Sequence, residues 1–422
     1  MRVKVWIIAC ICLFSSGMLK AQDKSEKLEQ KTQLLESSRN KFTLSGYIQA
    51  QYQYAQTDAD GINFKMAQRK NAYETAEQKD FGRFGLRRGR LKLTYEEGIA
   101  AGVVQIDVTE KGINTDRNVV TFKDIYLQVK GPWAGNNMLK AGVFYRPFGF
   151  EIAYSSSRRE SPERSRIIQS LFPDERDLGL SLTLQPPLRM LKFEGGLFAG
   201  NGIKPQFTNR MDFIGRLSIT KDASFGAGVS AYLGGVLQQH EQTYKMKDKT
   251  WVIVSETPHN IGKYAKRRYI GFDAQYSVKT VAGLTQIRGE YIFGEHPGNE
   301  AAAYPFNFNG LPPVTAVYIR KINGGYALLT QDLGKTPFTF VAKYDWYNPN
   351  TQISGNQITN SGEITVSTIG FGLYWHVNQA LRLTAYYDFV RNETTNQLRD
   401  DAYSWDKDRK DNVFTLRLQY RF

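Results

Sequence analysis

Three basic residues at alternate positions are the clearest chemical feature of the sequence. Arg88, Arg90 and Lys92 lie close together, and in an extended strand a spacing of two puts their side chains on one face. A row of guanidinium and ammonium groups attracts anions, and converging groups bind phosphate or carboxylate through charge-assisted hydrogen bonds. The same row also fits a solvated strand face that merely tolerates charge. The residue types therefore indicate either an anion site or an ordinary polar face.

A second group of charged residues lies between positions 147 and 176. Its basic members are Arg158, Arg159, Arg164, Arg166 and Arg176. Its acidic members are Glu151, Glu160, Glu163, Asp174 and Glu175, so the formal charges cancel. Specific phosphate capture needs several unpaired basic groups that converge on one narrow point. The segment therefore favours a general preference for anions over specific recognition of phosphate.

Residues suited to catalysis or metal binding have no useful spacing. The four histidines fall mostly in predicted loops without ligand-like spacing; they are His240, His259, His296 and His376. No Gly-x-Ser-x-Gly motif lies at a strand-to-helix turn, where a nucleophile elbow would need it. We therefore expect no enzyme activity, no metal and no cofactor.

Strict alternation of apolar and polar residues predicts β-strands along most of the chain. Near the end, Phe414, Leu416 and Leu418 alternate with Thr415 and Arg417. Sixteen segments show this pattern, at approximately 42–54, 84–97, 100–110, 119–130, 138–146, 177–186, 190–200, 210–220, 225–238, 266–279, 281–294, 316–330, 337–347, 363–376, 379–391 and 412–422. Tilted strands of about 9–11 residues are long enough to cross a bilayer. Alternation alone also fits a soluble sandwich.

The connections between these segments alternate between long and short. The long ones cover 55–83, 111–118, 147–176, 201–209, 239–265, 295–315, 348–362 and 392–411. The short ones lie around Gly98, 131–137, 187–190, 221–224, Thr280, 332–336 and 377–378. A soluble sandwich has no reason to put every long loop at one end, whereas outer-membrane barrels have long extracellular loops and short periplasmic turns. We therefore predict an all-β fold, a transmembrane antiparallel β-barrel of 16 strands over residues 42–422.

The first 21 residues are typical of a secretory signal peptide. Arg2 and Lys4 form a basic start, the apolar run 5–14 follows, and a plausible cleavage site comes after residue 21. Residues 22–41 would then form a short periplasmic extension of charged, helix-favouring residues. Cleavage at this site predicts an exported protein of the outer membrane of a Gram-negative bacterium.

Cysteine content and net charge restrict the partners of an exported chain. Both cysteines, Cys10 and Cys12, lie in the predicted signal peptide, so the mature chain would have no disulfide and no thiolate metal site. The formal net charge is +14. For an exported protein, this charge fits outer-membrane lipid, lipopolysaccharide or an anionic solute better than nucleic acid.

The order of several short motifs resembles a known family. Pro-Phe-Gly ends the strand at 139–149, Glu-Arg-Ser follows at 163–165, and Pro-Asp-Glu-Arg-Asp-Leu-Gly at 173–179 opens the next strand. With Arg-Arg-Gly-Arg-Leu at 87–91 and the terminal Phe422, this order resembles the phosphate-selective porin O and P family, over most of the mature chain. The resemblance implies a homotrimeric anion channel with sixteen strands, basic side chains along its path, and the third long loop folded into the lumen as a constriction.

The candidate functional residues follow from strand parity and from this resemblance. Parity and the basic row give a candidate anion path of Arg88, Arg90, Lys92, Lys140, Arg146 and Arg216. The resemblance assigns the five arginines of the third long loop to the constriction. It also suggests that the barrel-insertion machinery recognises the apolar end of the chain, with Phe422, Tyr420 and Leu418.

The expected function is passive diffusion of small hydrophilic solutes across the outer membrane, with a preference for anions and with phosphate as a candidate. A barrel that serves as a surface adhesin or structural protein is the alternative. Only the long connections, such as 55–83 and 239–265, support that alternative. Conductance of the purified protein in a planar bilayer would separate the two.

Overall fold

The computed structural model describes residues 41–59, 61–64, 80–108, 120–131, 136–186, 190–204, 208–222, 224–300, 314–400 and 403–422. The predicted signal peptide and all but the last residue of the predicted extension lie outside these described residues. Within the described part of the chain, no helix has both the length and the apolar character needed to cross a membrane.

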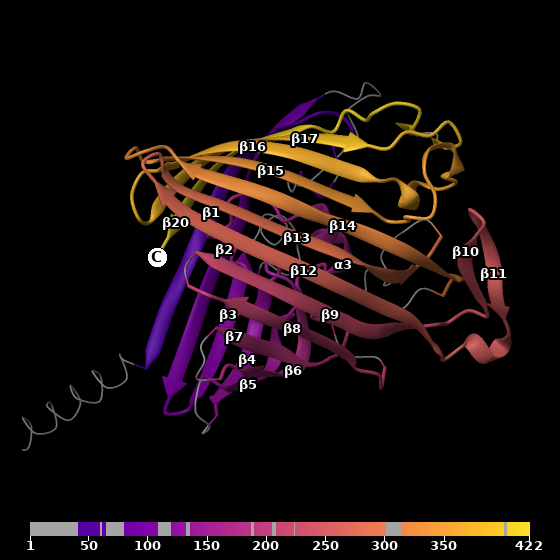
Figure 1. Ribbon diagram of the computed structural model, residues 1–422, viewed down its shortest axis with the longest axis horizontal. Helices are drawn as coiled ribbons and strands as arrows, with labels where there is room; N and C mark the ends of the chain where they lie inside the picture. Colours follow the sequence, from indigo (N-terminus) through magenta and orange to yellow (C-terminus); the bar gives the residue numbers. More distant parts are fainter. Residues whose placement is uncertain are drawn as a thin grey trace, which may run out of the picture.

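Sixteen antiparallel strands close into a barrel (Figure 1). They are β1 (Phe42–Ala55), β2 (Phe81–Glu97), β3 (Ala100–Val108), β4 (Thr121–Lys130), β5 (Met138–Tyr145), β6 (Arg176–Leu184), β7 (Leu191–Phe198), β8 (Asp212–Thr220), β9 (Phe225–Leu237), β12 (Tyr264–Thr280), β13 (Gly283–Gly298), β14 (Val317–Asp332), β15 (Phe338–Asn348), β16 (Val366–His376), β17 (Leu381–Asn392) and β20 (Val413–Arg421). Each strand pairs with its neighbour in the chain, and β1 pairs with β20 to close the ring. The predicted barrel is confirmed, and each predicted segment overlaps one of these strands.

The smaller elements lie in the long connections. A hairpin of β10 (Gln242–Lys247) and β11 (Thr250–Glu256) follows β9, and β10 pairs in parallel with the start of β14. The others are α3 (Arg166–Leu171), the 3₁₀ turns η1 (Pro258–Asn260), η2 (Gly355–Gln357) and η3 (Ser361–Glu363), and the short pair β18 (Arg399–Asp400) and β19 (Tyr403–Ser404). The connection 239–265, predicted as a loop, therefore contains a hairpin. Figure 1 shows this hairpin and the marked C-terminus at opposite ends of the barrel.

The two faces of the strands have opposite character. On β6, Leu178 and Leu180 point outward and are 39% and 48% exposed, whereas Ser181 and Thr183 point inward and are buried. A soluble sandwich would bury its apolar face, so this pattern is the reverse of a sandwich and fits a barrel surrounded by lipid.

The wall of the barrel has uneven height. Strands β3 to β8 contain 8 to 10 residues, whereas β12, β13 and β14 contain 17, 16 and 16. A low wall of β3 to β8 therefore faces a tall wall of β12 to β14. The third long loop, with α3, lies inside the ring between them (Figure 1).

Candidate functional site

Apolar side chains attach the third long loop to the wall of the barrel. Phe148, Ile168 and Phe172 of the loop are almost fully buried and pack in one cluster with wall residues such as Tyr232 and Tyr269. The rings of Phe172 and Tyr269 meet edge to face, with centroids 5.8 Å apart. The loop therefore has an apolar core of its own inside the barrel, which explains the bulky apolar residues at inward-facing positions of these strands.

Backbone groups of the same loop bond to carboxylates of the wall. Glu290 on β13 accepts hydrogen bonds from the backbone N–H groups of Phe150 and Glu151, both at 3.1 Å. Asp345 on β15 accepts one from the N–H of Arg166 at 3.2 Å. Because buried N–H groups need partners, these acids fix the path of the loop and do not face a solute.

One member of the predicted basic row, Arg88, takes part in a buried ion-pair cluster on the β1, β2 and β20 side. Glu163 of the loop contacts Arg87 at 2.7 Å, Arg88 at 2.9 Å and Arg417 at 3.1 Å. Glu163 and Arg88 are 8% and 3% exposed. Burial raises the pKa of the Glu163 carboxyl, but Arg87, Arg88 and Arg417 outweigh burial and hold that pKa well below its usual range. This ion-pair cluster fastens the loop to the wall.

Arg87 joins the cluster through a β-bulge that parity did not reveal. Gln49 of β1 pairs with Arg88, but the next residue, Ala50, pairs with Leu86, so Arg87 is the extra residue. The bulge allows two consecutive arginines to reach Glu163 from one strand. Strict alternation would have put Arg87 on the lipid side.

Most of the other basic residues that the sequence assigned to the anion path or the constriction loop, and that do not line the cavity described below, have a carboxylate partner or are buried. Arg90 pairs with Asp107 at 2.8 Å, and Arg176 pairs with Asp124 at 2.6 Å. Arg164 pairs with Glu175. The guanidinium of Arg159 donates to the carbonyl oxygens of Ser161 and Pro162, Arg166 is buried, and Arg158 is exposed.

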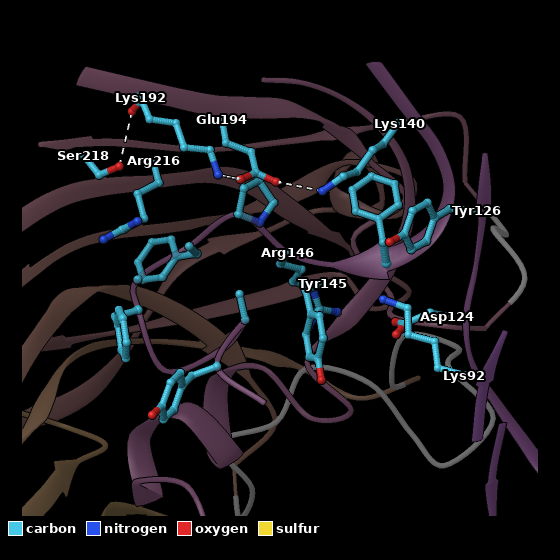
Figure 2. A pocket seen from close by; sticks show the side chains of 17 residues that line it. Lys92, Asp124, Tyr126, Lys140, Tyr145, Arg146, Lys192, Glu194, Arg216 and Ser218 are labelled. Carbon is cyan, nitrogen blue, oxygen red and sulfur yellow. Dashed lines mark hydrogen bonds and ion pairs between the residues drawn. The ribbon is translucent and has the colours of Figure 1, made fainter. Parts of the chain in front are cut away.

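A cavity of about 400 Å³ lies between the loop and the low wall (Figure 2). Its charged lining consists of Lys92, Asp124, Lys140, Arg146, Lys192, Glu194 and Arg216. Four of these, Lys92, Lys140, Arg146 and Arg216, belong to the predicted anion path, and the structure brings them together. Lys192 faces inward, as strand parity predicts. The sequence did not indicate that Lys192 and Lys140 would share the carboxylate of Glu194.

Ion pairs cancel only part of the positive charge in this cavity. Figure 2 shows Lys140 and Lys192 reaching Glu194 from two sides, at 3.5 and 2.9 Å. Arg216 donates twice to Asp273, at 2.9 and 2.6 Å. Among the residues that the structure describes, Lys92 has no side-chain hydrogen bond or ion pair. Two lysines therefore share one carboxylate, and a third has none.

Searches with the sequence find no relative, whereas the fold matches solved structures. No protein-family model matches the chain, and no curated protein matches it. The anion-selective porin from Comamonas acidovorans matches with a TM-score of 0.55 and 11% identity, over 90% of this chain and 99% of that one. The chain has a porin fold.

Two further solved structures match with the same TM-score. The outer membrane channel DcaP of Acinetobacter baumannii has a TM-score of 0.55 and 13% identity, over 90% of this chain and 97% of that one. Pseudomonas putida OprB has a TM-score of 0.55 and 9% identity, over 93% of this chain and 96% of that one. These likenesses establish the porin fold, and the narrower resemblance to the phosphate-selective porins O and P stays a prediction.

Proposed function

We propose that the protein is an outer-membrane porin, a passive diffusion channel for small hydrophilic solutes that prefers anions. The observation that carries the proposal is the cavity between the third loop and the low wall. Five basic residues line it. Arg146 and Arg216 are paired with Asp177 and Asp273, which leaves Lys92, Lys140 and Lys192 against the single acid Glu194. The solved porins with the same fold include one described as anion-selective, which supports the proposal.

The preference follows from fixed charge beside a narrow water path. Uncompensated cations raise the local concentration of anions, and the effect fades as the Debye length falls from about 10 Å at 0.1 M salt to about 3 Å at 1 M. Most arginines near the loop have carboxylate partners, so we expect moderate selectivity. Lys92, Lys140 and Lys192 would contribute most of it.

Planar-bilayer recording of the purified protein in a salt gradient tests this function. We expect stable conductance. At low salt the reversal potential should have the sign of an anion-selective channel, and at high salt it should move toward zero. A cation-selective channel would refute the anion preference. A folded barrel without conductance would instead favour the adhesin or structural alternative.

Phosphate is the narrower candidate solute. The cavity offers ammonium groups of lysines near one another, which suit a compact oxyanion, although Glu194 competes for two of them. If phosphate binds there, it should reduce the chloride current in a concentration-dependent way. A chloride current that phosphate does not change would leave general anion diffusion as the function.

We also propose a homotrimer that contacts its neighbours through the low wall. Gly102 and Ala141 line an outward apolar groove of about 420 Å³, bordered by Leu93 and Leu127. A Cβ atom added at Gly102 would meet nothing closer than 3.9 Å, so the barrel itself does not require glycine there. Gly102→Trp should fill the groove and yield folded monomers in native electrophoresis, whereas unchanged trimers would exclude this contact face.

Assembly at the closing seam depends, in our proposal, on the apolar terminal strand. Phe422 exchanges backbone hydrogen bonds with Gly46 at 2.9 and 3.0 Å, and the exposed rings of Tyr420 and Phe422 continue the outward face with Leu418. Deletion of Phe422 should lower the amount of heat-modifiable barrel in the outer membrane. Wild-type amounts would contradict a role in recognition by the insertion machinery.

We also propose that the protein is exported by cleavage of a signal peptide after residue 21. N-terminal sequencing of the mature protein tests this cleavage site.

A further inference from the structure

A group of basic side chains points outward from the barrel at the end with the long loops. Near the start of β12, where the strand leaves a long connection, Lys266 and Arg268 alternate with the buried residues Ala265 and Arg267. Both are exposed, and neither has a side-chain hydrogen bond or ion pair among the described residues.

Neighbouring strands add two more bases to the same surface. In the register of the sheet, Arg268 lies opposite Glu295 of β13, and Glu295 lies opposite Lys321 of β14. Lys321 is exposed. On the other side, Arg210 lies just before β8 and is exposed. Its guanidinium is 5.1 Å from the ring centre of Tyr264 and 3.9 Å from the carboxylate of Asp212. The basic patch of Arg210, Lys266, Arg268 and Lys321 thus contains four bases, with two acids, Glu295 and Asp212, beside them.

The residues directly below the basic patch are apolar and aromatic. Leu233, Ile270 and Phe272 are 50%, 43% and 50% exposed, and Leu233 is the cross-strand partner of Arg268. Phe293 is two residues from Glu295 on β13 and stacks on Phe272, with ring centroids 6.4 Å apart. Exposed aromatic residues mark the headgroup level of a barrel, so the basic patch lies where phosphate groups of lipid would be.

We propose that the basic patch binds the phosphorylated headgroup of an anionic lipid, such as the lipid A part of lipopolysaccharide, in the leaflet on the side of the long loops. The cations complement the phosphates, and the apolar surface below accommodates acyl chains. That continuity favours a lipid over free phosphate, which would gain nothing from exposed leucine and phenylalanine. The assignment of the leaflet rests on the proposed outer-membrane location, whereas the binding itself does not depend on channel activity.

Native mass spectrometry of the detergent-purified full-length protein with added lipid A tests the proposal. The variant Lys266→Gln/Arg268→Gln removes two cations without touching the lumen. Each basic residue near an anionic lipid surface contributes about a fivefold factor, so the pair should weaken lipid A binding by about thirtyfold. The matched control is Lys279→Gln/Lys130→Gln, which removes two exposed cations near the short turns and should leave binding unchanged.

Three results would overturn the proposal. The first is unchanged lipid A binding by the Lys266→Gln/Arg268→Gln variant, and the second is equal loss in the control variant. The third is displacement of lipid A by millimolar inorganic phosphate, which would make the patch a site for free phosphate. Heat modifiability and bilayer conductance of the variant should equal those of the wild type, so failure of lipid binding is separable from failure of the channel function.

Discussion

The two sides of the lumen use the same residue types for different purposes. On the side of β1, β2 and β20, arginines meet Glu163 of the third loop in a buried cluster. On the side of the low wall, lysines border a cavity and share Glu194. Arg88 and Arg417 on one side and the lysines on the other all face inward by strand parity. A partner supplied by the loop therefore decides whether an inward cation is fixed in a buried ion pair or stays at the edge of the cavity.

The largest effect should come from removing the shared acid of the buried cluster. Glu163→Gln leaves Arg87, Arg88 and Arg417 close together without a counter-charge, and loss of one partner from a buried pair costs about 3–5 kcal/mol. We expect the third loop to detach and the midpoint of urea unfolding in lipid vesicles to fall. Channel recordings should also become larger and noisier as the lumen widens.

A second substitution in the same cluster checks the cause of that effect. Adding Arg417→Gln to Glu163→Gln removes one of the repelling cations, so part of the lost stability should return. If the double variant were less stable than Glu163→Gln by the full cost of Arg417→Gln alone, the two residues would be independent and the cluster would not act as a unit.

An intermediate effect, on selectivity, should separate Lys92 from Arg90, its neighbour on the same strand face. Lys92 borders the cavity without a partner among the described residues, whereas Arg90 and Asp107 form a buried neutral pair. Lys92→Gln should lower the anion-to-cation permeability ratio by about two- to fivefold at low salt and have little effect at high salt. Arg90→Gln should change the ratio much less, because Arg90 is buried and does not line the cavity. Equal shifts would mean that the whole row lines the path.

The smallest effect should come from the acid on the cavity side. Glu194→Gln removes the partner of Lys140 and Lys192, which are partly exposed, so the cost in stability should stay below about 1 kcal/mol. The reversal potential should move further toward anions, opposite in sign to the Lys92→Gln shift. A large loss of stability would show that Glu194 holds the wall as Glu163 holds the loop.

Strand parity made most of the barrel predictable, and it failed where backbone geometry departs from regular pairing. The inward positions of Lys92, Lys140 and Arg216 followed from a period of two. The bulge at Arg87 could not be predicted, because two adjacent arginines give no sign of which one is extra. The β10–β11 hairpin turns on Asp248 and Lys249, both with positive φ. Asn-Gly would have marked such a turn clearly, whereas Asp-Lys does not.

The partners of the charged residues were beyond sequence reasoning. Charge counting correctly gave a balanced third loop, but it did not say that Glu163 would meet arginines from two strands at opposite ends of the chain. Such pairing depends on how the loop crosses the lumen, which its apolar residues decide by packing on Tyr232 and Tyr269. Periodicity describes a strand, whereas a loop inside a barrel is specified by contacts distant in sequence.

The seam between β1 and β20 has a consequence for the order in which the molecule is made. Gln49 pairs with Gln419, so the ring closes only when the two extremes of the sheet meet, and a contact of this span is slow to form. Every intermediate before closure exposes two unpaired strand edges, which readily join other chains. The sheet therefore keeps two open edges until its final strand is in place, and it stays vulnerable to aggregation for all of that time.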